Sequence, residues 1–187
     1  MTDCRVDLLP LEEARESAKA VEMIAAFADL NIFRVMLHRP KTAKALSDLL
    51  VSLLFGGELD DRLRELAIMR IGWVTGSDYE WTQHWRIAQD QFGCSEKDLL
   101  ELRGDWRNST HFGDDEKMLL EAVDALLERD TLPPELASQC LDRLGRNATI
   151  ELVTAVGAWR LVAKVTRGLE IPLEEGIASW PPDGRTP

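Results

Sequence analysis

The sequence lacks the motifs that carry redox, metal and nucleophilic chemistry. Its three cysteines, Cys4, Cys94 and Cys140, are far apart and odd in number. No C-x-x-C pair occurs, so neighbouring thiols can form neither a dithiol redox centre nor a zinc knuckle. The three histidines are too scattered to supply three metal ligands, and there is no phosphate loop, G-x-S-x-G elbow or H-E-x-x-H motif. We therefore expect structural thiols and no metal.

Positive charge and long apolar runs are also scarce. The 187 residues include 22 Lys and Arg but 33 Asp and Glu, which gives a formal net charge of -11. This balance argues against non-specific nucleic-acid binding, although a local Arg or His could still hold a small anionic substrate. Charges interrupt every apolar run before membrane-spanning length, and the N-terminus has no continuous apolar core typical of a secretory signal. We expect a cytoplasmic protein that binds neither nucleic acid nor membrane.

The sequence is dominated by helical periodicity. Hydrophobic residues make up 45% and charged residues 29%, which is ordinary for a soluble globular chain. No segment alternates at period two for long enough to predict a strand, so the predicted fold class is all-α. We predict one domain over residues 1–187, with a core from about 20 to 170 and a flexible tail over 172–187. Helices are expected over residues 11–30, 40–55, 61–74, 78–92, 96–104, 113–130, 133–145 and 149–165.

A few polar residues and glycines are predicted to begin or end these helices. Asn31 can cap a short turn that follows the first helix. Ser95 and Asp98 have the spacing of a capping box. Gly145 is expected to separate the last two helices, because glycine is the usual residue just beyond a helix end.

The stretch DRLRELAIMRIGWVTGSDYEWTQHWRIAQDQFGC, over residues 61–94, organises the rest of the chain. It predicts a helix without a polar face, a sharp break that contains glycine, and a second helix. On the first helix Ile68, Met69 and Trp73 lie opposite the main apolar side, so both sides must be buried. Oligomerisation is the simplest way to bury so much apolar surface in a short chain, and we predict a homo-oligomer.

Three residues of this stretch can perform proton chemistry, namely Glu65, Glu80 and His84. The last two are four apart and lie one turn from each other on one helical face. A helical hairpin would bring Glu65 close as well, and an imidazole between carboxylates can act as a proton shuttle. Each residue also has a structural explanation. Glu65 can pair with Arg62 or in the neighbourhood of Arg64, and Glu80 can complete a capping box with Ser77. His84 can be an ordinary hydrogen-bonded residue of the core.

Arg70 also needs an explanation, because it falls on the apolar side of the same helix. A buried guanidinium requires an acidic partner inside the fold. The sequence offers Glu65 through a long reach, or an acid elsewhere in the chain such as Asp48 or Glu151.

The motifs of the central stretch resemble the carboxymuconolactone decarboxylase family, which belongs to the alkylhydroperoxidase-D-like all-α superfamily. The resemblance is specific over about residues 61–95 and looser, in helix order, from roughly 20 to 170. It implies a compact multi-helix bundle around a central buried helical hairpin. The residues that carry it are Arg64-Glu65-Leu66-Ala67-Ile68, Tyr79-Glu80-Trp81, His84, and Ala88 with Gly93-Cys94-Ser95.

In the peroxidase branch of this superfamily, a glutamate, a C-x-x-C pair and a histidine form a proton relay. Glu65 stands at the position of the relay glutamate, while Ser77 and Glu80 stand where the two cysteines would be. The resemblance therefore points to the thiol-free branch, because dithiol peroxide reduction cannot occur at those positions. The implied reaction is cofactor-free decarboxylation of a small carboxylated γ-lactone in aromatic degradation, by a trimer or hexamer.

The resemblance also implies a role for the three central residues. His84 would be the general acid/base that protonates the dienolate carbon as CO2 leaves. Glu65 and Glu80 would orient the imidazole and relay its proton. Positioned acid–base catalysis of this kind is worth about 10²–10⁴-fold.

The implied substrate-binding residues are Arg64 or Arg70 for the carboxylate, together with Tyr79 and Trp81. Other functions remain open. The chain could act as a lyase on a different carboxylated substrate, or be a peroxidase-related protein that has lost its C-x-x-C pair. It could also be a non-catalytic oligomeric small-molecule-binding or partner protein of the same fold. A glutamate that only caps its helix and a histidine sealed in the core would favour this binding role.

Overall fold

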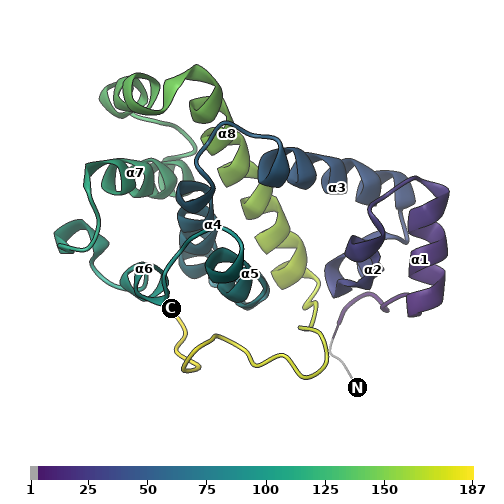
Figure 1. Ribbon diagram of the computed structural model, residues 1–187. Helices are drawn as coiled ribbons and strands as arrows, with labels where there is room; N and C mark the ends of the chain where they lie inside the picture. Colours follow the sequence, from purple (N-terminus) through teal and green to yellow (C-terminus); the bar gives the residue numbers. More distant parts are fainter. Residues whose placement is uncertain (1–3) are drawn as a thin grey trace. The chain divides into compact units, whose positions relative to one another are not determined.

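The computed structural model describes residues 4–187, and every regular element in that range is a helix (Figure 1). The predicted all-α fold class is confirmed. The chain forms two compact units. The first holds the described residues up to Gly56 together with Lys164–Ile177, and the second holds Gly57–Ala163 together with Ala178–Pro187. The single domain expected over residues 1–187 stays a prediction.

The first unit is built from α1 (Leu11–Ala20), η1 (Ala25–Asp29), α2 (Asn31–Met36) and α3 (Pro40–Phe55). The sequence predicted one helix over residues 11–30, but α1 ends at Ala20 and a turn follows. Glu22 has a positive φ of 55° in this turn, and a residue in that conformation cannot continue a right-handed helix. Pro40 opens α3 as predicted, because an N–H at that position would have no helical partner.

Asn31 does not cap α2 as predicted. The N-cap position is Leu30, which offers no side-chain hydrogen bond. The Asn31 amide group instead donates to the carbonyls of Pro172 and Leu173, each at 3.2 Å. Its backbone N–H donates to Glu174 Oε1 at 2.8 Å. Asn31 therefore binds the segment at residues 172–174 to the first unit, and its spacing in the sequence gave no sign of this.

The second unit contains α4 (Asp61–Thr75), α5 (Asp78–Asp90), α6 (Glu96–Glu101), η2 (Trp106–Asn108) and α7 (Asp114–Arg129). It also contains most of α8 (Pro134–Gly168), whose last residues belong to the first unit. The predicted break at Gly145 is confirmed, because this residue has a φ of 84° that glycine adopts readily. Ser95 and Asp98 form the predicted capping box at the start of α6.

α4 and α5 form the predicted helical hairpin. Gly76 ends α4 in the left-handed conformation, with a φ of 63°. Ser77 then caps α5 by accepting a hydrogen bond from the Glu80 N–H. The two helices approach closely at Gly72, where an added Cβ would lie 3.1 Å from the Trp81 backbone nitrogen. The hairpin therefore depends on two glycines, one in its turn and one between its helices.

Most of the apolar surface of α4 is covered within this chain, although Val74 is 45% exposed. Ile68, Met69 and Trp73, which we expected to be buried either in the core or between subunits, are at most 7% exposed. α4 packs against α5 and α7, which provide much of this cover. The homo-oligomer stays a prediction, and the apolar circumference of α4 no longer argues for it.

The C-terminal tail is not the flexible arm that we predicted. Trp180 is buried, and its N–H donates to Asp78 Oδ1 at 3.0 Å and to Thr82 Oγ1 at 3.1 Å. Its ring lies against those of Trp73 and Trp81, with centroids 5.8 and 6.3 Å apart. Aromatic packing and hydrogen bonds to the first turn of α5 therefore hold the tail to the second unit.

Arg103 also binds the C-terminal tail through hydrogen bonds. It donates from Nη1 to Asp183 Oδ1 at 2.7 Å and from Nη2 to the Pro181 carbonyl. Its guanidinium also lies over three indole rings, at 4.9 to 5.7 Å from their centroids, and such cation–π contacts are favourable when desolvated. These rings belong to Trp73, Trp81 and Trp85.

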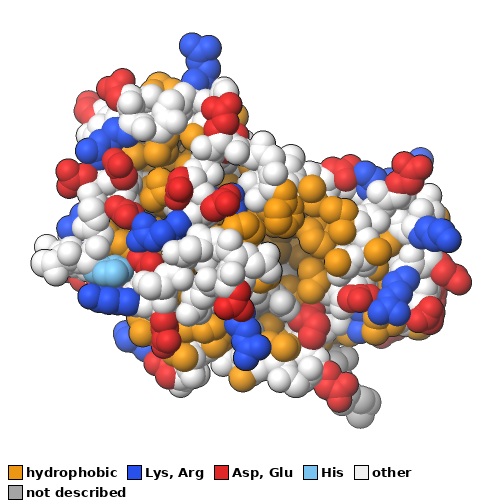
Figure 2. Space-filling view, in the orientation of Figure 1, with side chains coloured by type: hydrophobic (Ala, Val, Ile, Leu, Met, Phe, Trp, Pro, Cys, Tyr) orange, Lys and Arg blue, Asp and Glu red, His pale blue; other side chains and the backbone are white. Residues whose placement is uncertain are grey.

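The surface carries charges of both signs. On the face drawn in Figure 2, Asp and Glu side chains are interspersed with Lys and Arg, so neither sign forms an uninterrupted field. Over residues 4–187, no helix combines the length and the apolar character that crossing a membrane requires.

Candidate active site

The structure brings together the three residues that the sequence selected for proton chemistry. Glu65 on α4 accepts a hydrogen bond at Oε2 from His84 Nδ1 on α5, at 2.8 Å. Glu80 lies one turn before His84, and its charge acts on both of these residues. Glu65 is fully buried, and the other two are at most 9% exposed. The hairpin thus assembles a buried carboxylate–imidazole–carboxylate group, the Glu65–His84–Glu80 cluster.

The second nitrogen of His84 is bound by Trp159, which lies on α8. Trp159 Nε1 donates to His84 Nε2 at 3.2 Å, and the two rings meet edge-on with centroids 5.9 Å apart. An indole N–H can only donate, so Nε2 must be the acceptor and Nδ1 must carry the proton. His84 is therefore the neutral Nδ1–H tautomer, and it donates its proton to Glu65.

The surroundings of His84 act on its pKa in both directions. Burial lowers this pKa, because it disfavours the imidazolium. The charge of Glu65, its hydrogen bond to Nδ1 and the charge of Glu80 raise the pKa, while the charge of Arg64 lowers it slightly. The net effect is a pKa above the ordinary value of 6.5, so the imidazole is a better base than a free one.

Glu80 has the surroundings of a carboxyl group that binds a proton near neutral pH. Burial raises its pKa to about 7, the charge of His84 lowers it, and the charge of Glu65 raises it. Its side chain does not complete the capping box, because the Ser77 N–H donates to the Gly72 carbonyl at 2.9 Å. Within the part of the chain that the structure describes, the Glu80 carboxyl accepts no hydrogen bond.

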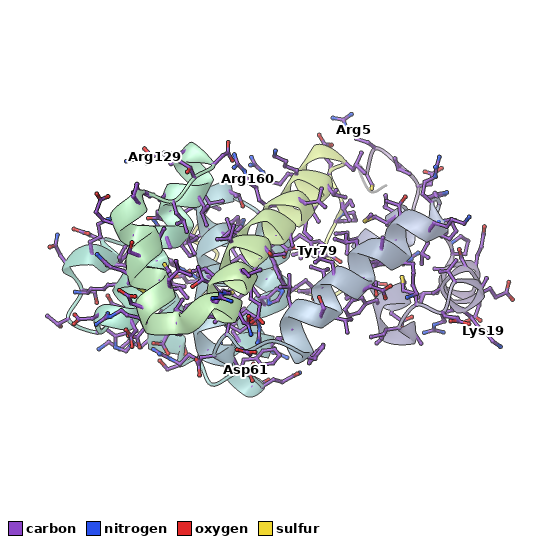
Figure 3. All side chains as sticks on the ribbon, turned by 90° about the horizontal axis from the view of Figure 1, so that it is seen from above. Arg5, Lys19, Asp61, Tyr79, Arg129 and Arg160 are labelled. Atoms are coloured by element: carbon purple, nitrogen blue, oxygen red, sulfur yellow. The ribbon has the colours of Figure 1, made fainter. Side chains whose placement is uncertain are left out.

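Arg64 places a positive charge beside Glu65. Its Nε lies 3.6 Å from Glu65 Oε1. Its Nη1 forms an ion pair with Asp61 Oδ1 at 2.5 Å (Asp61 is labelled in Figure 3). The guanidinium carbon lies 4.6 Å from the centre of the Phe92 ring. Nε and Nη2 of Arg64 and Oε1 of Glu65 are buried without a hydrogen-bond partner among residues 4–187. Arg64 thus offsets the charge of Glu65 and retains two donors for a polar ligand.

Two other arginines of α4 have partners that the sequence did not suggest. Arg70 was expected to pair with Glu65 or with an acid of another predicted helix. It holds Asp124 of α7 with two hydrogen bonds, at 2.8 and 2.9 Å, and donates to the Leu102 carbonyl at 2.7 Å. Arg62, the expected partner of Glu65, binds Asp98 instead. All three nitrogens of the Arg70 guanidinium are engaged, which disfavours the substrate-binding role given to it.

Tyr79 and Trp81 were also expected at the substrate. Trp81 is fully buried, and its Nε1 donates to the Pro181 carbonyl at 2.8 Å. Its ring lies 5.6 Å from that of Trp85, within the aromatic packing that holds the tail. Tyr79 is 5% exposed and is the second residue of α5 (labelled in Figure 3). The structure thus gives Trp81 a packing role, and the substrate contacts of both residues stay a prediction.

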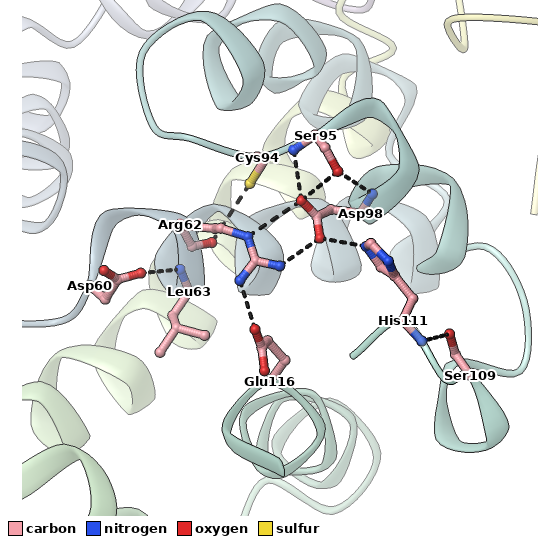
Figure 4. A network of polar contacts seen from close by, with 9 residues as sticks. All are labelled: Asp60, Arg62, Leu63, Cys94, Ser95, Asp98, Ser109, His111 and Glu116. Atoms are coloured by element: carbon pink, nitrogen blue, oxygen red, sulfur yellow. Dashed lines mark hydrogen bonds and ion pairs between the residues drawn. The ribbon is translucent and has the colours of Figure 1, made fainter. Parts of the chain in front are cut away.

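A second histidine–carboxylate contact lies around Asp98 (Figure 4). Asp98 Oδ1 accepts from His111 Nε2 at 2.9 Å and from Arg62 Nη2 at 2.6 Å. Its Oδ2 accepts from Ser95, from the N–H at 2.7 Å and from the hydroxyl at 2.8 Å. Burial raises the pKa of Asp98, but Arg62 and the other donors hold it well below its usual range. Arg62 also pairs with Glu116 at 2.7 Å, so the network joins α4, α6 and α7.

The thiols have no activating surroundings. Cys94 and Cys140 are buried, and all three cysteines are free. Burial raises the pKa of Cys94 to about 12 and also raises that of Cys140, so both stay protonated at neutral pH. Among the described residues, no group of three or more His, Cys, Asp or Glu side chains could hold a metal ion.

Trp159 is the site residue that sequence reasoning missed. It is separated from His84 by 75 positions, and it lies outside the motif that carries the family resemblance. The sequence around Trp159 is strongly apolar, and a tryptophan on such a helix is more often a packing residue than a functional one. Only the packing of α8 on the hairpin reveals that its N–H meets an imidazole.

The fold and the site define a class, an all-α protein of the alkylhydroperoxidase-D-like fold with a buried Glu–His–Glu cluster. A peroxidase-related protein from Ralstonia eutropha JMP134, described as an alkylhydroperoxidase AhpD core, matches with a TM-score of 0.75 and 12% identity over 94% of each chain. One from Silicibacter sp. TM1040 matches with a TM-score of 0.72 and 12% identity over 95% of each chain. A protein of unknown function from Agrobacterium tumefaciens, named as a candidate antioxidant defence protein AhpD, has a TM-score of 0.66 and 22% identity, over 74% of this chain and 96% of its own.

The family model that matches this chain is that of the carboxymuconolactone decarboxylase family, over residues 40–125. The matched segment contains Glu65, Glu80 and His84 but not Trp159. No curated protein matches the sequence. The match supports the resemblance seen in the motifs, and the similar structures establish the fold alone, since their identities are 12 to 22%.

Proposed function

We propose that this chain is a thiol-free relative of the peroxidase-related proteins of its fold, in which the Glu65–His84–Glu80 cluster transfers protons to and from a small molecule. The observation that carries the proposal is the buried hydrogen bond between Glu65 Oε2 and His84 Nδ1, at 2.8 Å. A carboxylate in this position orients an imidazole, and it raises the pKa of the ring. Both effects are typical of acid–base sites.

A thiol mechanism does not fit the residues present. Ser77 and Glu80 stand at the positions that the resemblance gives to the redox cysteines, and neither can form a disulfide. The thiolate is the reactive form of cysteine, and Cys94, with a pKa of about 12, supplies almost none at neutral pH. We therefore assign the protein to acid–base chemistry without a redox cycle, as the thiol-free branch would use.

A small carboxylated lactone is the substrate that the family resemblance favours. When its C–CO2 bond breaks, the electron pair moves into the ring as a dienolate, and a proton delivered to carbon completes the reaction. This chemistry needs a proton donor and a group to hold the carboxylate, and it needs no cofactor. Arg64, whose Nε and Nη2 have no hydrogen-bond partner among the described residues, suits the carboxylate better than Arg70, which Asp124 already binds.

The substitution His84→Gln tests the proposed function. The wild-type protein is mixed with 4-carboxymuconolactone, and release of CO2 and loss of ultraviolet absorbance are followed. We expect the variant to be slower by about 10²–10⁴-fold, because it removes the ionisable centre of the cluster. His38→Gln is the matched control, since His38 Nε2 lies 2.8 Å from the Asp7 carbonyl and both residues belong to the first unit. Full activity of a folded His84→Gln variant would refute the proposal.

A second candidate function is small-molecule binding without catalysis. The observation that favours it is the occupation of both His84 nitrogens, by Glu65 and by Trp159. A binding protein would show a saturable change in tryptophan fluorescence with the lactone and no turnover. Measurable turnover by the wild-type protein excludes this alternative.

A further inference from the structure

Both ring nitrogens of His84 form hydrogen bonds within the protein. Its Nδ1 donates to Glu65 at 2.8 Å, and its Nε2 accepts from Trp159 at 3.2 Å. Trp159 is 1% exposed, so the indole N–H is held in a packed position. As the site stands, neither imidazole nitrogen is free to exchange a proton with a ligand.

Glu80 differs from both of its partners in the cluster. Glu65 is fully buried between His84 and Arg64, and it already accepts the imidazole proton. Glu80 keeps 4% of its surface exposed, and in the described part of the chain no hydrogen bond reaches its carboxyl group. Of the three residues, Glu80 alone has no hydrogen bond to any of its side-chain polar atoms in the described part of the chain.

We propose that Glu80 is the catalytic residue that exchanges a proton with the ligand, and that Trp159 is a positioning residue that holds His84 neutral. The inference rests on the proposed function and deepens it. His84 then acts on Glu80 through its charge state and through its fixed position between Glu65 and Trp159, rather than by delivering a proton itself. His84→Gln removes this bridge as well as the ionisable group, so the loss of turnover expected for that variant still holds.

The link between the two residues is electrostatic. To become an imidazolium, His84 must bind a second proton at Nε2, where the Trp159 N–H already points. Trp159 therefore opposes the protonation of His84, and the positive charge of Arg64 also disfavours it. The charges of Glu65 and Glu80 favour this protonation. A cationic His84 would stabilise the ionised form of Glu80. When His84 is neutral, burial keeps Glu80 protonated.

The proton step balances without a co-reactant. Protonated Glu80 faces the dienolate carbon, the electron pair released from the C–CO2 bond forms the new C–H bond, and the Glu80 O–H bond breaks. Glu80 is left as the carboxylate and takes its next proton from water. The pKa of Glu80 is raised to about 7 by burial, so both forms are present near neutral pH, as a group that cycles between them requires.

The first test is Trp159→Phe, which keeps an aromatic ring and removes the N–H. A hydrogen bond contributes about 0.5–1.5 kcal/mol, which converts to a rise of roughly 0.4–1.1 units in the His84 pKa. Nitrogen-15 NMR of the imidazoles measures this pKa and the tautomer, with the His84 signals assigned from His84→Gln. Turnover should fall as the pH rises through the pKa of Glu80. In Trp159→Phe we expect this fall at a lower pH than in the wild type, because a cationic His84 lowers the pKa of Glu80.

The matched control is Trp106→Phe. Trp106 is also buried and donates from its indole to Asp124 Oδ2 at 3.3 Å, away from the cluster. This variant should leave the His84 pKa and the pH profile unchanged. If Trp159→Phe fails to fold, the test is the tautomer of His84 in the wild-type protein, measured by the same NMR experiment. A proton on Nδ1 supports the proposal, and a proton on Nε2 overturns it.

The second test is Glu80→Gln, which should reduce turnover at least 100-fold while His84 keeps its Nδ1–H tautomer. Wild-type turnover in this variant, or an unchanged His84 pKa in folded Trp159→Phe, overturns the inference and leaves the proposed function standing. Full turnover in His84→Gln refutes the proposed function instead. The tautomer measurement needs no substrate, so the two failures can be distinguished.

Discussion

Two histidine–carboxylate pairs in this protein share one chemistry and differ in their surroundings. His84 lies 2.8 Å from Glu65, and His111 lies 2.9 Å from Asp98. Asp98 also accepts hydrogen bonds from Arg62 and from the capping residue of α6, so both of its oxygens are bound more than once. Only one oxygen of Glu65 is hydrogen-bonded, since its Oε1 has no hydrogen-bond partner among the described residues and lies 3.6 Å from Arg64 Nε.

The difference separates a structural network from a candidate active site. A saturated carboxylate stabilises the fold, because every buried lone pair has found a donor. An unsaturated cluster of ionisable groups costs stability, and such costs are characteristic of sites kept for function. The comparison predicts that substitutions at the two sites will change stability in opposite directions.

The largest effect is expected at the saturated site. Asp98→Ala leaves the His111 imidazole and the Ser95 N–H without their acceptor, and it leaves Glu116 as the one remaining carboxylate that Arg62 contacts among the described residues. Breaking such a pair should lower the free energy of unfolding by about 3 kcal/mol. Urea denaturation of the variant and the wild type measures the change. Asp115→Ala is the control, because the ion pair of Asp115 with Arg143 is exposed and should contribute little.

The pH dependence of stability tests the same network. Because the folded pKa of Asp98 lies below its unfolded value, its contribution is present above about pH 4 and is lost as the pH falls through the folded pKa. The wild-type protein should therefore lose stability below about pH 4, and Asp98→Ala should lose less. Equal slopes in thermal melts from pH 5 to pH 2 would contradict this assignment.

A smaller effect of opposite sign is expected at the candidate site. The folded pKa of Glu80, about 7, lies above its ordinary value of 4.5, so the wild type loses stability as the pH rises between these values. Glu80→Gln cannot ionise, and it should be more stable than the wild type at pH 8, by roughly 1–3 kcal/mol. Thermal melts at pH 5 and pH 8 measure this gain. The exposed Glu96→Gln is the control and should show no pH-dependent gain.

The smallest effect is expected at the thiols. At pH 8 a thiol reagent should label Cys4, which is half-buried, and leave Cys94 and Cys140 unmodified until the protein unfolds. Mass spectrometry of the labelled peptides locates the modified positions. Rapid labelling of Cys94 in the folded protein, or robust thiol peroxidase turnover, would contradict the acid–base assignment.

Much of the fold could be predicted from local patterns. The helices α3 to α7, the break at Gly145 and the capping box of α6 follow from hydrophobic spacing and from the preferences of Pro, Gly, Ser and Asp at helix ends. The predictions that failed depend on distant contacts. Asn31 binds residues 172–174 instead of capping a helix, and Trp180 packs on the hairpin instead of ending a flexible tail.

The candidate site divides in the same way. Helical spacing alone places Glu80 and His84 on one face of a helix and predicts that a hairpin brings Glu65 beside them, because helical geometry fixes those relations. The atoms that meet are known from the folded arrangement of the helices. This arrangement gave Glu65 the Nδ1 proton, placed the indole of Trp159 on Nε2 and left the Glu80 carboxyl without a hydrogen bond in the described chain. These outcomes depend on packing between helices far apart in the chain, which local spacing does not encode.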